Sequence, residues 1–185
     1  NPFFTGREDT LQSLYTALTV DKTAALVDAQ ALTGLGGIGK TQAAVEYAYR
    51  YASDYPEAIL WARADSREVL TAGFASIAEV LDLPEKRDQD LNLVLAAVKR
   101  WMKDRTHWLL ILDNVEEPAL LDEFLPTSHR GHILLTTRTQ SVRFLANNIR
   151  VEKWSPDVGA LFLLRRIKMI ALSDELDHAA PTDRD

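Results

Sequence analysis

The sequence contains no cysteine, which excludes disulfide bonds and zinc sites built from thiolates. Its histidines have none of the spacings of metal ligands; they are His107, His129, His132 and His178. No segment is apolar for long enough to span a bilayer. The opening, Asn1-Pro2-Phe3-Phe4, shows neither a Met nor the basic stretch of a secretory signal. These absences lead us to expect a cytoplasmic fragment of a longer protein, with no membrane partner.

Positive charge is also in the minority. The 185 residues include 21 Lys and Arg against 27 Asp and Glu, a formal net charge of -6. A nucleic-acid-binding surface usually carries an excess of positive charge, so we do not expect nucleic acid as a partner. Hydrophobic residues make up 46% of the chain, which is enough for a packed core. The length fits one domain, with two domains as the weaker alternative.

What the sequence does contain is a glycine-rich stretch at residues 34–41, with the pattern G-x-x-x-x-G-K-[ST] of a phosphate-binding loop. Glycines let the backbone curl so that several N–H groups point at one polyphosphate. Lys40 supplies a positive charge for the β- and γ-phosphates, and the Thr41 hydroxyl can bind Mg²⁺. The predicted nucleotide contacts of this stretch are Gly36, Gly37, Ile38, Gly39, Lys40 and Thr41, and Gln42 directly after it is a further predicted contact.

The context of the loop supports this interpretation. Residues 29–33 before it have the pattern of a strand, and residues 41–49 after it have apolar side chains at helical spacing. The positive end of that helix would point at the phosphates. A flexible glycine-rich loop that binds nothing is the alternative, and the strand–loop–helix context counts against it.

Strand and helix patterns alternate along the rest of the chain, which predicts a parallel sheet with helices on both faces. Ligands of such sheets bind beyond the carboxyl ends of the strands. The predicted strands cover residues 29–33, 59–64, 108–112, 132–137 and 149–153. The predicted helices start at Glu8, at Thr41 (ending by Asp54-Tyr55-Pro56), and at Ser66, Leu91, Pro118, Thr139 and Pro156. We divide the chain into a lead-in loop and helix (1–20), a nucleotide-binding domain (21–172) and a polar, acidic tail that begins a linker (173–185).

Asp113 follows the continuous apolar run 108–112, which is typical of a parallel strand covered on both faces. A carboxylate at such a strand end can hold Mg²⁺ opposite Thr41, as the Walker B aspartate does. A helix-capping Asp is the alternative. The next residue, Asn114, cannot accept a proton at neutral pH. Glu116 or Glu117 could take that role, although surface charge before a helix is the favoured interpretation of both.

Arg138 follows the strand predicted over 132–137, where its planar fork of donors could reach a γ-phosphate. Such a contact would distinguish a triphosphate from a diphosphate; a surface arginine is the alternative. The tryptophans are interpreted as packing residues rather than a stacking platform; they are Trp61, Trp101, Trp108 and Trp154.

Together these motifs resemble the NB-ARC class of STAND ATPases, especially its bacterial and fungal members with repeats. The resemblance covers about residues 3–170 and rests on four stretches in this order: Phe4-Thr5-Gly6-Arg7-Glu8, Gly34 to Thr41, Leu109 to Asp113, and Ile133 to Arg138. It implies a three-layer P-loop fold with strand order 5-1-4-3-2. It also implies ATP or ADP with Mg²⁺ as ligands, and a slow ATPase used as a signalling switch.

The resemblance also assigns residues and partners. Lys40, Asp113 and the sensor arginine Arg138 would serve catalysis, Thr41 and Asp113 would bind the metal, and Thr5 and Arg7 would lie against adenine. Self-association would follow in the ATP state of the full-length protein. The winged-helix domain and the Gly-Leu-Pro-Leu segment of the family do not occur before Asp185, so we expect a nucleotide-binding core whose partners include further domains of a longer chain.

Three functional hypotheses follow. The leading one is a nucleotide-controlled switch with slow hydrolysis. A P-loop ATPase or phosphotransferase with fast turnover is the second, but the sequence shows no motif for an acceptor pocket. The third is a scaffold domain that ignores nucleotide, and the presence of Lys40, Thr41 and Asp113 counts against it.

Overall fold

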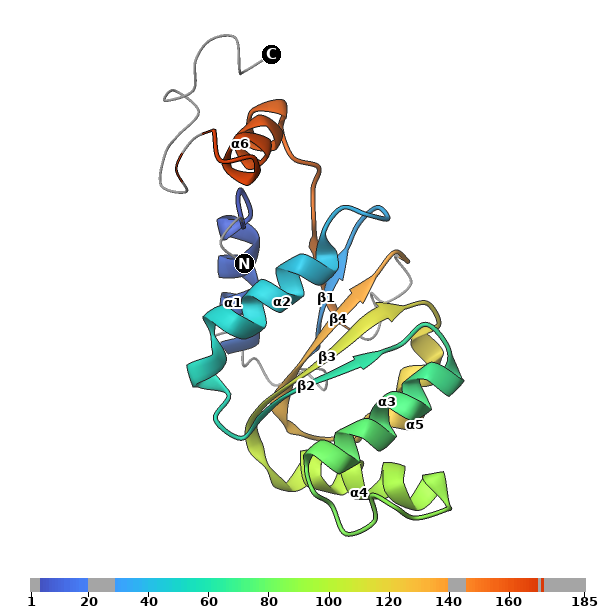
Figure 1. Ribbon diagram of the computed structural model, residues 1–185. Helices are drawn as coiled ribbons and strands as arrows, with labels where there is room; N and C mark the ends of the chain where they lie inside the picture. The colour runs from blue at the N-terminus through green and yellow to red at the C-terminus, as the bar shows by residue number, and fades with distance from the viewer. Residues whose placement is uncertain (1–3, 20–28, 140–145, 170, 172–185) are drawn as a thin grey trace.

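The computed structural model describes residues 4–19, 29–139, 146–169 and 171 (Figure 1). Within them the strands are β1 (Ala29–Thr33), β2 (Ala58–Arg63), β3 (Thr106–Val115), β4 (Arg130–Thr137) and β5 (Asn147–Arg150). The α-helices are α1 (Glu8–Thr19), α2 (Lys40–Arg50), α3 (Arg67–Val80), α4 (Leu91–Asp104), α5 (Leu121–Phe124) and α6 (Pro156–Arg166). Two short 3₁₀ helices, η1 (Ala52–Asp54) and η2 (Pro118–Leu120), complete the described elements.

The strands form one sheet in the order β2-β3-β4-β1-β5, and all the pairs are parallel. Read from the other edge, this is the predicted order 5-1-4-3-2, which is therefore confirmed. The order places β3, β4 and β1 side by side. The three segments that carry the chemical motifs thus leave the sheet from neighbouring strands and at the same edge.

Helices cover both faces of the sheet, as the alternation of side chains in β3 requires (Figure 1). Leu109 and Ile111 pack on one face with residues of α1 and α2, including Leu14 and Tyr47. The intervening side chains point to the other face, where α3 and α4 contribute their own apolar side chains to a second core. The apolar run in β3 is therefore buried on both faces, and the three-layer α/β architecture is confirmed.

The caps of three helices follow from the sequence. Ser66 accepts a hydrogen bond from the Val69 backbone at the start of α3, and Asp90 accepts one from Asn92 at the start of α4. Ser155 caps α6 in the same way, with Pro156 at its first position. No helix in the described part of the chain is long and apolar enough to cross a membrane.

Several predicted boundaries were wrong. β3 does not end before Asp113 but continues to Val115, because the chain resumes pairing with Thr137 of β4 after an irregularity. β5 ends at Arg150 rather than at residue 153. The Val151 N–H still donates to the Thr33 carbonyl at 2.8 Å, and beyond this hydrogen bond the chain leaves the sheet toward α6. α2 ends at Arg50, and η1 separates it from Pro56.

Two further predictions concern residues outside the described part of the chain. The helix expected over 139–146 falls mostly on residues 140–145, and the tail expected over 173–185 falls wholly outside.

Candidate functional site

The glycine-rich stretch forms the loop between β1 and α2, and its backbone shape requires glycine. Gly37 and Gly39 have φ angles of +73° and +94°, in the left-handed region where a side chain is strained. Gly39 is the N-cap of α2 and makes no side-chain capping hydrogen bond. The first N–H groups of an α-helix have no partner within the helix, so the start of α2 offers donors and a positive dipole end to an anion at the loop.

Lys40 bends back over this loop. Its Nζ donates to the carbonyl oxygens of Gly34 and Leu35, at 2.9 Å each. Burial lowers the pKa of Lys40, the nearby charge of Arg138 lowers it further, and Asp113 acts in the opposite direction. Both hydrogen-bond partners are neutral carbonyls, so the ammonium can turn toward an anion in the loop without breaking an ion pair.

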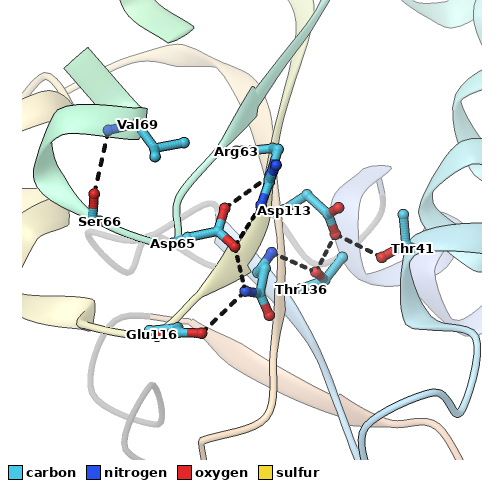
Figure 2. Close-up of polar contacts among 9 residues, drawn as sticks. Thr41, Arg63, Asp65, Ser66, Val69, Asp113, Glu116 and Thr136 are labelled. Carbon is cyan, nitrogen blue, oxygen red and sulfur yellow. Dashed lines mark hydrogen bonds and ion pairs between the residues drawn. The ribbon is translucent and has the colours of Figure 1, made fainter. Parts of the chain in front are cut away.

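Thr41 and Asp113 meet as the motifs predicted (Figure 2). The Thr41 hydroxyl donates to Oδ1 of Asp113 across 2.8 Å, and the Thr136 hydroxyl of β4 donates to the same oxygen across 2.5 Å. Thr136 in turn accepts a hydrogen bond from the Asn114 backbone at 2.9 Å. The carboxylate of Asp113 is thus positioned by two hydroxyls from different elements. No sequence motif marks Thr136, and only the pairing of β3 with β4 shows that it holds Asp113.

The strand carrying Asp113 bulges at this point. Leu112 pairs with Leu135 and Val115 with Thr137, so β3 has one more residue than β4 between the two pairs. Asn114 lies within this bulge, and its backbone is left-handed, with a φ of +61°. Asn is among the residues that tolerate this left-handed conformation best.

The side chain of Asn114 joins a polar network at the ends of β2 and β3 (Figure 2). Its amide donates to Asp65 at 2.8 Å and to Glu116 at 3.2 Å. Arg63 donates twice to Asp65, at 2.9 Å each, and this is the main cause of the lowered pKa of the Asp65 carboxyl. No sequence motif marks Asp65; its position just after a strand that neighbours β3 was the available signal. Glu117 is exposed.

Arg138 lies where it was expected, directly after β4 and against the glycine loop. A Cβ atom added to Gly36 would lie 3.4 Å from the Arg138 Cζ atom, so the guanidinium rests on the loop backbone. The side chain is exposed rather than enclosed. It can therefore contact an anion bound in the loop.

The lead-in segment forms another wall of the site. Thr5 and Arg7 are buried, with 4% and 8% of their surface exposed. Arg7 donates through Nη2 to the Ile38 carbonyl, and burial lowers its pKa. Thr5 accepts a hydrogen bond from Arg165 of α6 at 3.2 Å. The segment therefore contacts the glycine loop on one side and α6 on the other.

Two cavities border the loop, and their linings differ. The first, about 430 Å³, lies between the lead-in segment, the loop and α6; Phe4, Trp154 and Phe162 give it aromatic walls. The second, about 820 Å³, lies above β1 and β5 and contains Arg138 and Arg150. The prediction that the tryptophans are packing residues was wrong for two of them. Trp61 and Trp154 are 37% and 36% exposed, and Trp154 lines the first cavity, whereas Trp108 is fully buried.

The sheet order and the glycine loop that follows β1 define a P-loop nucleoside-triphosphatase fold. Within that class, the chain belongs to the NB-ARC family, because the NB-ARC domain matches residues 7–164. The match begins at Arg7 in the lead-in segment and ends at Leu164 in α6, so it includes the glycine loop, Asp113 and Arg138.

Individual relatives agree with this assignment. A nucleotide-binding leucine-rich repeat (NLR)-like protein of Hyaloscypha variabilis is 32% identical over 157 residues, which cover 75% of this chain and 16% of that protein. The regulatory protein AfsR of Streptomyces griseus is 28% identical over 176 residues, which cover 90% of this chain and 17% of AfsR. The chain thus spans about a sixth of the length of these curated relatives.

A solved structure shares the fold. Cdc6p from Pyrobaculum aerophilum superposes with a TM-score of 0.65 and 19% sequence identity, over 88% of this chain and 49% of that one. At this identity the likeness supports the fold and not a shared activity.

Proposed function

We propose that this chain is a nucleotide-controlled switch domain that binds ATP or ADP with Mg²⁺ and hydrolyses ATP slowly. The observation that carries the proposal is the convergence of Lys40, the Thr41–Asp113 pair and Arg138 on one curled glycine loop. Lys40 and Thr41 lie at the start of α2, Asp113 lies near the end of β3, and Arg138 follows β4. All of them are groups of the kind that bind a polyphosphate and its Mg²⁺.

The residues fit the ligands that the proposal requires. The loop is curled through left-handed glycines, and the uncapped start of α2 faces it, as a bound phosphate needs. Thr41 and Asp113 place two oxygen atoms 2.8 Å apart, and oxygen is the donor that Mg²⁺ prefers. When bound, Mg²⁺ neutralises charge on the phosphates. Thr41 and Asp113 would hold it, while Lys40 would bind phosphate oxygens directly.

Arg138 supplies the difference between the two nucleotide states. A ligand shifts a conformational equilibrium only by its difference in affinity for the two conformations. The position of its guanidinium on the loop at Gly36 supports the proposal that Arg138 contacts a third phosphate, which a diphosphate lacks. That contact would make the ATP-bound and ADP-bound forms differ in free energy.

Slow hydrolysis follows from Asn114. This side chain stands directly after Asp113, and an amide cannot accept a proton from an attacking water at neutral pH. It is already hydrogen-bonded to Asp65 and Glu116. Asp65 is in turn held by Arg63, and its lowered pKa makes it a weak base. We therefore expect turnover slow enough for a switch.

The wider context is also part of the proposal. One similar protein is named a regulatory protein and another an NLR-like protein, and both are far longer than this chain. We propose that the chain acts in the cytoplasm by controlling further domains of a longer protein, among them winged-helix and repeat domains, and that the ATP state self-associates. The division into a lead-in (1–20), a nucleotide-binding domain (21–172) and a linker start (173–185) belongs to the same proposal.

The test compares ATP and ADP affinity in the wild type and in Arg138→Ala. Loss of a charge-assisted hydrogen bond to the third phosphate should weaken ATP binding about 10-fold and leave ADP binding within about twofold. Arg150→Ala is the matched control, because Arg150 lines the same cavity but is paired with Glu152 at 3.0 Å. An equal loss of ATP and ADP affinity in Arg138→Ala would contradict the role of Arg138 in distinguishing the two nucleotides. Hydrolysis of several ATP molecules per second by the wild type would contradict a slow switch and favour a fast ATPase.

A further inference from the structure

We propose that Thr136 is a positioning residue for the metal ion: its hydroxyl holds the Asp113 carboxylate so that Oδ2 is the oxygen that serves Mg²⁺, directly or through water. The inference rests on the proposed function, and it names the residue that sets how tightly the nucleotide-bound site holds its ion. Thr136 lies near the end of β4, outside the glycine loop, and reaches Asp113 from the neighbouring strand.

The hydrogen bonds of the Thr136 hydroxyl have a fixed direction. The oxygen accepts from the Asn114 backbone N–H at 2.9 Å, and an N–H can only donate. A hydroxyl has one proton and an ionised carboxylate can only accept, so this proton goes to Oδ1 of Asp113, 2.5 Å away. Thr136 is only 1% exposed, so water does not compete for the proton. The contact is an enclosed, charge-assisted hydrogen bond, which is among the stronger kinds in proteins.

Both hydroxyls that contact the Asp113 carboxylate reach the same oxygen (Figure 2). Thr41 donates to Oδ1, as Thr136 does, and Oδ2 accepts no hydrogen bond from the described residues. The Thr41 oxygen keeps its lone pairs when it donates its proton. Oδ2 of Asp113 and the Thr41 oxygen are therefore the two atoms that remain for an ion.

The bulge in β3 explains why this carboxylate depends on a side-chain hydroxyl. The extra residue of β3 interrupts the regular pairing with β4 directly after Asp113. The N–H of Asn114, inside the bulge, donates to the Thr136 hydroxyl. One side chain of β4 thus joins the irregular backbone of β3 to the carboxylate beside it. Asp113 cannot turn Oδ1 away without breaking that connection.

The next residue, Thr137, is a threonine with a purely structural set of partners. Adjacent residues of a strand point to opposite faces, so Thr137 lies on the face of β4 opposite to Thr136. Its hydroxyl donates to the Val115 carbonyl at 2.6 Å and accepts from the Thr139 N–H at 3.0 Å. Thr137 is fully buried, as Thr136 nearly is. The two threonines therefore differ in whether the hydroxyl contacts Asp113.

The experiment measures ATP binding to the 185-residue chain with Mg²⁺ and with EDTA in place of Mg²⁺. By linkage, the ratio of the two dissociation constants equals the ratio of the Mg²⁺ affinities of bound and free ATP. This Mg²⁺ enhancement therefore reports on the ion rather than on the glycine loop. Thr136→Val should lower it about 10- to 100-fold, the usual loss when a partner of a metal ligand is removed. ATP affinity in EDTA should not change.

Three further variants separate positioning from structure. Thr136→Ser keeps the hydroxyl and should restore most of the Mg²⁺ enhancement. Thr137→Val should be destabilised in urea unfolding, as Thr136→Val is, because a buried backbone group loses its partner. Its Mg²⁺ enhancement should nevertheless equal that of the wild type. Thr136→Cys, whose thiol is a weak donor and acceptor, should lie between the Val and Ser variants, and it tests the inference where Thr136→Val does not fold.

The outcomes are distinct. A wild-type Mg²⁺ enhancement in Thr136→Val would overturn the positioning role. So would a fall that Thr136→Ser does not reverse, or an equal fall in Thr137→Val, which would show a general effect of weakening β4. Equal ATP affinity of the wild type with Mg²⁺ and with EDTA would overturn the metal site of the proposed function, and the role of Thr136 with it.

Discussion

At the scale of single residues, Asn114 shows how a backbone requirement and a chemical role coincide. The bulge after Leu112 demands a left-handed residue, and Asn meets that demand with a φ of +61°. Its amide then donates to the carboxylates of Asp65 and Glu116. A hydrogen-bond donor suits this position between two acidic side chains, so an acid is disfavoured here for electrostatic reasons.

Asn114→Asp tests this directly. The new carboxylate would face Asp65 and Glu116 without a donor, and we expect the free energy of unfolding to fall by about 1–2 kcal/mol at pH 7. The neighbouring acids would raise the pKa of the new group in the folded state. The destabilisation is therefore present above that pKa and disappears as the pH falls toward about 4, where the group is protonated and can donate.

Asn114→Gly is the control, measured by urea unfolding at the same pH values. Gly accepts the left-handed backbone and removes the same hydrogen bonds without adding a charge. Its stability difference from the wild type should change little with pH. A loss for Asn114→Asp that stays constant between pH 7 and pH 4 would contradict the electrostatic account.

At the scale of elements, a close contact joins β3, β4 and α4 at the starts of the two strands, at the ends away from the site. Trp108 of β3 is fully buried, and its indole nitrogen donates to the Met102 carbonyl of α4 at 3.0 Å. Gly131 of β4 lies against this ring: an added Cβ would come within 2.2 Å of the indole Cδ2. A small residue at Gly131 is thus what allows the tryptophan to lie between helix and sheet.

Gly131→Ala should therefore lower the free energy of unfolding by about 1–3 kcal/mol or more, because neither the backbone nor the enclosed ring can move aside without cost. Gly159→Ala is the matched control in α6. A Cβ there would meet nothing within 4 Å, and replacing a glycine inside a helix should stabilise the chain by about 0.5–1 kcal/mol. Urea unfolding of the two variants gives changes of opposite sign. A neutral Gly131→Ala would show that the indole is not tightly enclosed.

The elements and the residues differ in how far the sequence could predict them. The apolar run before Asp113 and the alternation of strands and helices were sufficient for a parallel sheet covered on both faces. The strand order came from the resemblance to a family. The boundaries of β3 and β5 were wrong because a bulge and a divergence from the sheet depend on the partner strand, which leaves no local pattern.

The same distinction holds in the site. Lys40, Thr41 and Asp113 were predictable because fixed spacing and a strand end place them. Thr136 and Asp65 were missed, since their contacts form only when β4 and β2 pair with β3. Trp154 was assigned to the core because aromatic residues usually pack there. Its contact with Arg7 joins opposite ends of the chain, and only the tertiary structure shows it.

At the scale of the whole molecule, the order of the strands decides where chemistry can occur. Adjacent β1, β4 and β3 bring the glycine loop, Arg138 and Asp113 to one edge of the sheet. The lead-in segment and α6, from the two ends of the described chain, meet beside that edge through Thr5 and Arg165. The glycine loop is therefore connected to α6 through a chain of contacts, from Ile38 to Arg7, from Arg7 to Trp154, and from Trp154 to Phe162 of the helix.

The most direct test of the account is a calorimetric titration of Mg·ATP into the wild-type chain and Lys40→Ala. We expect the wild type to bind with one site and Lys40→Ala to bind at least about 10-fold more weakly, because an ammonium that contacts phosphate oxygens is lost. Lys99→Ala is the control, since Lys99 lies on α4 and donates to the Glu123 carbonyl. It should bind like the wild type. Equal affinity in Lys40→Ala and the wild type, with both folded, would contradict the assignment of the glycine loop as the phosphate site.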